Sequence, residues 1–532
     1  MSFSESTFTR RAVLRAGTGA LIATAMPSGF AAAPEASFAN TRSGRIVGAR
    51  VGDLHVFRGL PYGADTRTRR FQRAPRETPW RGVRDATAFG ASAPQTGDAD
   101  GQAISEDCLF LNLWTPALRD GRKRPLLVYV HGGGYNTGSG SHPAYDGGAL
   151  CRRGDVVVVT LNHRLNAFGY LHLADIEGAD ERFADAGNIG QWDLIQALHW
   201  LREHAGEFGF DAGNVTLFGQ SGGGAKIATL MAMPAARGLF HKAVTLSGQQ
   251  VTAAGPRAAT RRAKLLLESL SATPADLLEL PMQRLLEATR LRDPSWVEDT
   301  HLYFGPVLDA RGLPRHPFHP EAPAQSAGIP MMIGNTRDET RAFLSSDPVN
   351  LDLRWDQLPE RIRLQQYVDL DPQAVIDTYR RQYPAYSPSE VFFAATTAGR
   401  SWRAAILEAE ARARQGAPAW VYQLDWRSRA EPEKRAFHTL DIALMFDNTR
   451  QPGARTGDDA DARRMAARMS TALLAFARSG DPNHPDLPHW PPYTLPARTT
   501  MIFDDRCRIE DDPRGGERRL YEQAPFIQRG TM

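Results

Sequence analysis

The chain has few cysteines and almost no net charge, and both shortages narrow what it can be. Its three cysteines, Cys108, Cys151 and Cys507, are odd in number and widely spaced. They therefore form neither a disulfide framework nor a CxxC metal site, and they allow one bridge at most. The 63 basic and 60 acidic residues leave a formal charge of +3, which argues against a nucleic-acid or membrane-surface partner.

Lysine is scarce as well. Among the 63 basic residues only five are lysines, namely Lys123, Lys226, Lys242, Lys264 and Lys434. We interpret the excess of arginine as a coding bias rather than as a binding device.

The sequence also lacks an apolar run long enough to span a bilayer. A short one, residues 16–25, follows Arg10 and Arg11 and precedes the small residues at 31–33. This is the layout of a cleavable export signal, and the paired arginines are typical of a twin-arginine signal; the alternative is a basic tail. We expect residues 1–33 to be the signal and residues 40–532 to be one catalytic domain. That domain would be periplasmic or secreted and free of the membrane after cleavage.

What the chain has instead is a series of short, continuously apolar runs. They lie at 126–130, 156–161, 215–219, 242–248, 330–334, 420–426 and 499–505. Such runs are typical of strands covered by helices on both faces. Between them, apolar residues recur at helical spacing over 192–205 and 463–480. The alternation predicts an α/β fold with a mostly parallel central sheet, and the segments 251–300 and 350–415 are predicted as helical insertions over the active site.

The run at 215–219 leads into Gly219-Gln220-Ser221-Gly222-Gly223, which fits the G-x-S-x-G pattern. A helical stretch follows, and strand–turn–helix is the setting of a nucleophile elbow. The flanking glycines remove Cβ atoms that would clash in so sharp a turn. A phosphate-binding loop is disfavoured because no Lys-Ser or Lys-Thr pair closes the motif. Ser221 is therefore predicted to be a nucleophile.

A serine nucleophile needs donors for the developing oxyanion, a base and an orienting acid. The motif "HGGGY" at 131–135 follows the apolar run at 126–130. Its consecutive glycines allow backbone N–H groups to face a ligand. We predict Gly133 and Gly134 as oxyanion donors, joined by the N–H of Gly222.

The acid and the base are expected after the nucleophile, in the order acid, histidine. The candidate acids are Asp309, Asp338 and Glu339, and the residues alone do not decide between Asp338 and Glu339. The histidines further along are His438, His484 and His489. His438 precedes an apolar run, whereas His484 lies in a turn-like stretch and packing explains His489. The residues therefore favour His438 as the base.

Together these motifs resemble the type-B carboxylesterase family, the cholinesterase-like branch of the α/β-hydrolases. Matching stretches run in order through most of the chain and include "VFRGLPYG" (56–63), "SEDCLFLNLWTP" (105–116), "HGGGYNTGSGS" (131–141), "IGNTRDETRAF" (333–343) and "FARSGDPNHPDLPHWPPY" (476–493). The resemblance implies the α/β-hydrolase fold and a triad of Ser221, His438 and Glu339. It leaves Asp338 a local role in the turn.

The resemblance also implies further residue roles and shows departures from the family pattern. It implies a buried ion pair between Glu106 and Arg164. The family usually has "GESAG" at the elbow, so Gln220 replaces a glutamate and Gly222 an alanine; losing that charge weakens the expectation of cationic substrates. Ala93 stands where the family places a partner for Cys108, which is therefore expected to be a buried free thiol. The residues predicted to line the substrate pocket are Tyr135, Gln220, Phe304 and Phe343.

These observations predict a serine esterase that acts on a small-molecule ester through an acyl-enzyme, without a cofactor or a metal. The same triad would serve a carbamate, amide or lactone hydrolase. Some family members are binding proteins without a triad, and the presence of all three residues disfavours that alternative.

Overall fold

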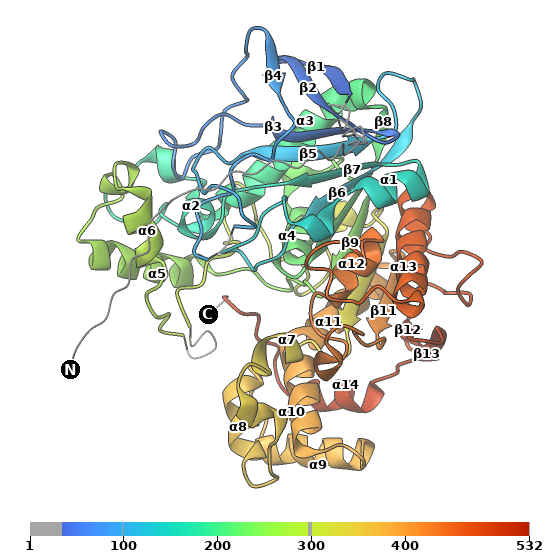
Figure 1. Ribbon diagram of the computed structural model, residues 1–532. Helices are drawn as coiled ribbons and strands as arrows, with labels where there is room; N and C mark the ends of the chain where they lie inside the picture. The colour runs from blue at the N-terminus through green and yellow to red at the C-terminus, as the bar shows by residue number, and fades with distance from the viewer. Residues whose placement is uncertain (1–34, 98, 296–299, 531–532) are drawn as a thin grey trace, which may run out of the picture. The chain divides into compact units, whose positions relative to one another are not determined.

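One large β-sheet runs through the computed structural model, which describes residues 35–97, 99–295 and 300–530 (Figure 1). The predicted export signal, residues 1–33, lies outside the described residues. The strand order is β1-β2-β3-β5-β7-β6-β8-β9-β10-β11-β12-β13, with β4 beside β2. The strands are β1 (Ala36–Thr41), β2 (Gly44–Val51), β3 (Leu54–Pro61), β4 (Val83–Asp85), β5 (Phe110–Thr115), β6 (Arg124–Val130), β7 (Val157–Leu161), β8 (Phe210–Gln220), β9 (Lys242–Leu246), β10 (Met331–Thr336), β11 (Ala419–Leu424), β12 (Thr499–Phe503) and β13 (Arg508–Asp511).

In the central part of the sheet, with the order β7-β6-β8-β9-β10-β11-β12, all neighbouring strands pair in parallel. Each of these strands corresponds to a predicted apolar run. The edges are antiparallel, formed by β1, β2, β3 and β5 on one side and β13 on the other. The antiparallel strands were not predicted. Several of them have a mixed composition, as in β1, where exposed and buried residues alternate. The mostly parallel sheet of an α/β-hydrolase is thus confirmed.

Helices cover both faces of this sheet. On one face α3, α4 and α11 pack with one set of strand residues, and on the other α1, α12 and α13 pack with the alternate set. The helices are α1 (Gly148–Gly154), α2 (Asn166–Tyr170), α3 (Ile189–Phe208), α4 (Gly222–Ala232), α5 (Pro256–Leu270), α6 (Met282–Ala288), α7 (Arg341–Leu344), α8 (Leu358–Gln365), α9 (Pro372–Gln382), α10 (Pro388–Thr397), α11 (Arg403–Gln415), α12 (Leu440–Phe446), α13 (Ala460–Ser479) and α14 (Gly515–Tyr521). None of the helices within the described ranges is both long enough and apolar enough to cross a membrane.

The two segments predicted as insertions are helical. In the first, α5 and α6 share an apolar cluster with α2. In the second, α8, α9 and α10 form a separate cluster with α14, seen in yellow, orange and red in Figure 1. The last helix of that segment, α11, packs instead on β10 and β11 and so belongs to the layer that covers the sheet.

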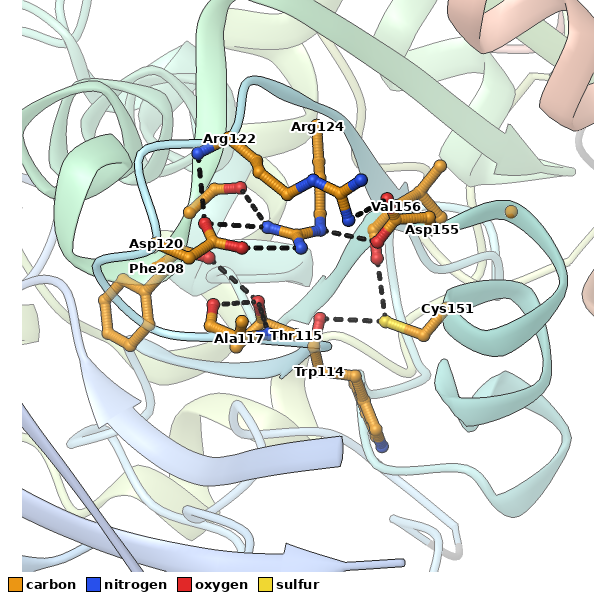
Figure 2. A network of polar contacts seen from close by, with 12 residues as sticks. Trp114, Thr115, Ala117, Asp120, Arg122, Arg124, Cys151, Asp155, Val156 and Phe208 are labelled. Atoms are coloured by element: carbon orange, nitrogen blue, oxygen red, sulfur yellow. Dashed lines mark hydrogen bonds and ion pairs between the residues drawn. The ribbon is translucent and has the colours of Figure 1, made fainter. Parts of the chain in front are cut away.

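At the start of β6, Arg124 joins the sheet to two helix ends (Figure 2). Its buried guanidinium forms ion pairs with Asp120 (Nη2–Oδ2 2.7 Å) and Asp155 (Nε–Oδ1 2.6 Å). It also donates to the carbonyl of Gly209 at 3.3 Å. Asp155 ends α1 and Gly209 ends α3, so one side chain connects two helix ends with the beginning of a core strand.

All three cysteines are free thiols. In α1 the Cys151 Sγ lies 3.1 Å from the carbonyl oxygen of Trp114 and 2.9 Å from that of Val156 (Figure 2). Cys108 is fully buried, as expected from the missing partner. Burial raises the pKa of both thiols well above the usual range. The two groups therefore remain protonated and serve as packing residues.

The prediction of an ion pair between Glu106 and Arg164 is wrong. Arg164 binds Asp193 in α3 (Nη2–Oδ1 2.6 Å and Nε–Oδ2 2.8 Å), and both side chains are almost fully buried. Glu106 binds Arg70 instead (Nε–Oε2 2.6 Å). The two residues are buried charges, as the resemblance implied, but each has a different countercharge, because the fold brings Asp193 of α3 beside Arg164 and Arg70 beside Glu106.

We expect Asp193→Asn to lower the free energy of unfolding by about 3–5 kcal/mol, because Arg164 would remain buried without a countercharge. Urea denaturation monitored by far-UV circular dichroism measures the change. The matched control is Asp180→Asn, which removes the partner of Arg182 in an ion pair that is half exposed on both sides and should leave the denaturation midpoint close to that of the wild type. Equal midpoints for Asp193→Asn and the wild type would contradict the expectation.

Candidate active site

Ser221 stands at the turn between β8 and α4. Its backbone has φ 55° and ψ −128°, a conformation that residues with a side chain rarely adopt. The Ser221 N–H donates to the carbonyl of Leu246 at 2.8 Å, and Ala225 N–H donates to the carbonyl of Ser221 at 3.1 Å. The end of β9 and the first turn of α4 thereby hold the strained turn, which presents the hydroxyl at the carboxyl ends of the parallel strands.

The glycines around Ser221 allow backbones to approach without side chains between them. A Cβ atom on Gly223 would lie 1.9 Å from the carbonyl oxygen of Val130, at the end of β6. A Cβ atom on Gly222 would lie 1.9 Å from the carbonyl oxygen of Gly134. No side chain is accommodated at such distances. At Gly222 this also explains a departure from the family pattern, because alanine does not fit beside Gly134 in this arrangement.

The loop that follows β6 carries the predicted oxyanion donors. Gly133 and Gly134 both have left-handed backbones, with φ 81° and φ 62°. The carbonyl of Gly133 accepts hydrogen bonds from the N–H groups of Asn136 (3.2 Å) and Thr137 (3.1 Å), which close the turn. Gly134 and Gly222 line the same cavity as Ser221. The structure thus brings this loop against the elbow.

Glu339 and His438 are in direct contact. Glu339 Oε2 is paired with His438 Nδ1, and Oε1 accepts from Thr336 N–H at 2.8 Å and from Asn335 Nδ2 at 3.2 Å. Burial opposes ionisation of Glu339, but the adjacent His438 and these hydrogen bonds outweigh it and lower the pKa of the carboxyl. Glu339 is therefore a carboxylate that holds the imidazole by Nδ1 and leaves Nε2 available.

The other candidate acids and histidines lie elsewhere. Asp338 Oδ2 accepts from the N–H of Ala436 at 3.3 Å, which fastens the loop that carries His438. Asp309 accepts from Asn188 Nδ2 at 2.6 Å in a separate turn. Two further side chains, His484 and His489, are not among the cavity-lining residues. The contact with His438 thus distinguishes Glu339 from Asp338, which the residues alone did not.

Ser221, Glu339 and His438 line one cavity of about 680 Å³, a volume typical of a small-molecule site. Within the described residues no hydrogen bond joins the Ser221 hydroxyl to His438. In enzymes without substrate such contacts are often long and tighten only in the complex. Among the described residues, no cluster of His, Cys, Asp and Glu could hold a metal ion.

The residues predicted to line the pocket divide into two groups. Tyr135 and Phe343 line the cavity, and the Phe343 ring lies 5.0 Å from the His438 ring. Phe304 does not: it is buried in the apolar cluster of α5 and α6, while the neighbouring Tyr303 lines the cavity. The prediction for Phe304 was wrong because successive residues of an extended segment face opposite sides.

Gln220 is also absent from the cavity lining, because its side chain is buried against His438. Gln220 Nε2 lies 3.1 Å from His438 Nε2 and 3.4 Å from Nδ1. A donor at nearly equal distance from both nitrogens would collide with Cε1 if it were in the ring plane, so the amide lies over the face of the ring. The in-plane lone pair of Nε2 is therefore left to face another group.

Lys226 in α4 is a site residue that the sequence analysis missed. Its fully buried Nζ donates to the carbonyls of Gly134 (2.9 Å) and His131 (3.3 Å) and lies 5.3 Å from the centre of the Tyr135 ring. Burial lowers the pKa of the ammonium to about 7, while two carbonyl acceptors favour the charged form. A lone lysine within the apolar stretch 222–233 was the available signal.

Comparisons with known proteins show the same family that the arrangement of Ser221, His438 and Glu339 indicates. The sequence profile described as the carboxylesterase family matches residues 35–518. The para-nitrobenzyl esterase of Bacillus subtilis (strain 168) is 34% identical over 505 residues, which cover 90% of this chain and 97% of the relative. The phenmedipham hydrolase of Pseudarthrobacter oxydans is 32% identical over 495 residues, which cover 88% of this chain and 95% of the relative.

Solved structures show the same likeness. The crystal structure of a Geobacillus stearothermophilus carboxylesterase at pH 6.2 superposes with a TM-score of 0.81 at 36% identity, covering 91% of this chain and 99% of that one. A solved structure of PNB esterase superposes with a TM-score of 0.77 at 32% identity, again covering 91% of this chain and 99% of that one.

We expect Lys226→Met to reduce turnover of p-nitrophenyl acetate roughly tenfold or more with little change in KM, because the Gly134 carbonyl loses its donor and the loop beside Ser221 loses its position. Methionine has a similar length and costs little to bury. The control is Lys264→Met, on an exposed position of α5, which should be as active as the wild type. Thermal unfolding of both variants checks the fold, and a fully active, folded Lys226→Met enzyme would contradict the expectation.

Proposed function

This chain belongs to the carboxylesterase family and is a serine carboxylic-ester hydrolase, and we propose that Ser221, His438 and Glu339 are its nucleophile, base and acid. The observation that carries the assignment is the contact of the Glu339 carboxylate with His438 Nδ1 in the cavity that Ser221 lines. The strained turn at Ser221 supports it, because such turns present a nucleophile above the sheet.

In the proposed reaction, Ser221 Oγ attacks the ester carbonyl and His438 Nε2 takes the hydroxyl proton. Glu339, already ionised, stabilises the imidazolium that forms. The N–H groups of Gly133, Gly134 and Gly222, the three donors predicted from the sequence, are proposed to stabilise the oxyanion. His438 then protonates the leaving alcohol, and water repeats the steps on the acyl-enzyme.

The substrate is proposed to be a small-molecule ester, in keeping with the cavity volume and with the names of the relatives. The same proton transfers would serve carbamate, amide or lactone bonds. Matched substrates that differ only in the scissile bond separate these activities by their kcat/KM values. We prefer ester hydrolysis because the matching family is the carboxylesterase family and a similar solved structure is that of a carboxylesterase.

Replacing Ser221 by alanine should lower kcat for p-nitrophenyl butyrate by at least ~10³-fold, because the nucleophile is lost while binding is not. A fluorophosphonate probe should label the wild type on the peptide that contains Ser221, as mass spectrometry would show. Ser401→Ala, at another serine that lines the cavity, should still be labelled. Labelling of Ser221→Ala at the same rate, or full activity of that variant, would refute the assignment.

We further propose that residues 1–33 direct export by a twin-arginine route to the periplasm or the medium, and that the mature chain is not bound to the membrane. The support is the pair Arg10 and Arg11 before a weak apolar run. In a bacterium with this pathway, the double substitution of both arginines by lysine should retain the longer precursor in the cytoplasm. Arg15→Lys is the control, and N-terminal sequencing of exported protein locates the cleavage. Unchanged export of the double variant would contradict the route.

A further inference from the structure

One wall of the cavity carries a cation that ester cleavage does not use. Arg400 lies in the π-helical turn Ala398–Trp402, between α10 and α11, and it lines the cavity with its neighbours Gly399 and Ser401. π-Helical turns are rare and are found frequently at functional sites. Tyr367, over whose ring the Arg400 guanidinium lies at 4.0 Å, also lines the cavity and has a strained backbone with φ 54°.

The Arg400 side chain is partly exposed at the cavity, and no carboxylate neutralises its charge. Its Nη2 donates to Gln365 Oε1 at 3.1 Å, and its Nε is buried without a partner. No carboxylate of the described residues forms an ion pair with it. A partly desolvated cation that lines a cavity without a countercharge can form charge-assisted hydrogen bonds with an anionic group of a ligand.

The acidic residues in and near the cavity do not offset the charge of Arg400. Among the described residues that line the cavity, Glu339 is the one carboxylate, and it is committed to His438. Glu408, two turns beyond Arg400, is fully buried, and burial raises its pKa to about 8. At neutral pH Glu408 is therefore mostly uncharged.

A second donor without a partner lines the same cavity. Gln249 is buried and lines the cavity, and its Nε2 has no partner. The N–H of the next residue, Gln250, donates to Glu408 Oε1 at 2.8 Å, which places this segment against α11. Glu408 follows Arg400 by eight residues, roughly 12 Å along the helix axis. Arg400 and Gln249 thus offer an ionic and a neutral donor to a ligand in this cavity.

The wall also lies next to the triad. The Ser401 hydroxyl accepts from Asn335 Nδ2 at 2.9 Å, and the same amide donates to Glu339 Oε1 at 3.2 Å. Close to the nucleophile, Gln220 stands where the family usually has a glutamate, so a negative charge that would repel an anion is absent. These contacts place the turn that carries Arg400 next to the triad.

We propose that Arg400 and Gln249 form a carboxylate subsite, so that the preferred substrates are esters that bear a free carboxylate in addition to the scissile bond. The inference rests on the proposed esterase function. Arg400 supplies charge-assisted hydrogen bonds to the carboxylate, and Gln249 supplies one neutral hydrogen bond. The subsite holds one end of the substrate while Ser221 attacks the ester carbonyl.

The test compares kcat/KM for charged and neutral esters of equal length. In the acyl arm, mono-p-nitrophenyl glutarate is compared with p-nitrophenyl valerate; in the alcohol arm, 4-acetoxybenzoate is compared with its methyl ester. We expect the wild type to prefer the charged member of at least one arm by about tenfold or more. That arm then shows which side of the substrate the subsite holds.

Arg400→Gln should remove this preference and lower kcat/KM for the charged ester by about 10- to 100-fold, while the neutral ester changes by less than about threefold. Arg400→Lys should retain part of the preference. Arg363→Gln, at an exposed position of α8, is the control and should behave as the wild type.

Several results would overturn the subsite. One is a wild type without preference in either arm, and another is Arg400→Gln lowering both esters equally, which would make Arg400 a structural residue. In both cases neutral esters are still hydrolysed, so the proposed function stands. Failure of the wild type to hydrolyse any of the four esters would instead count against the proposed function itself.

Discussion

The whole site depends on the close approach of backbone to backbone at the carboxyl ends of β6, β8 and β9. A Cβ atom on Gly223 would meet the end of β6, and one on Gly248 would lie 1.8 Å from the carbonyl oxygen of Ser221. Since no side chain fits there, the turn is held by three strand ends rather than by its own residues. This packing sustains the unfavourable backbone of Ser221 and sets the position of its hydroxyl.

Around this rigid centre, the helical segments determine what enters. The ends of the core strands and the loops that follow them supply Ser221, Glu339 and His438. Residues of both helical segments predicted as insertions also line the cavity, such as Arg290 after α6 and Tyr367 before α9. Reaction chemistry and substrate choice are thereby built from different parts of the chain. Substrate choice can therefore change while the reaction chemistry remains, which fits a family whose members are named after different substrates.

Much of the fold could be predicted because apolar runs and helical spacing are local properties. The parallel strands, α3 and α13 follow from them, and Ser221 follows from its glycines. Partner choices could not be predicted in this way. The choice of Asp193 by Arg164 depends on which buried segments meet, and the role of Lys226 depends on a loop about ninety residues earlier in the chain. The choice of Glu339 needed either the family resemblance or the observed contact with His438.

The contact between Gly222 and Gly134 restricts how this elbow can change in evolution. Lys226 holds the Gly134 carbonyl at the place that the alanine methyl group of the usual family elbow would occupy. A lineage that moves towards the alanine form must first replace the lysine and let the loop withdraw. Gly222 and Lys226 are therefore expected to be inherited together, and Lys226 must be replaced before Gly222 can become alanine.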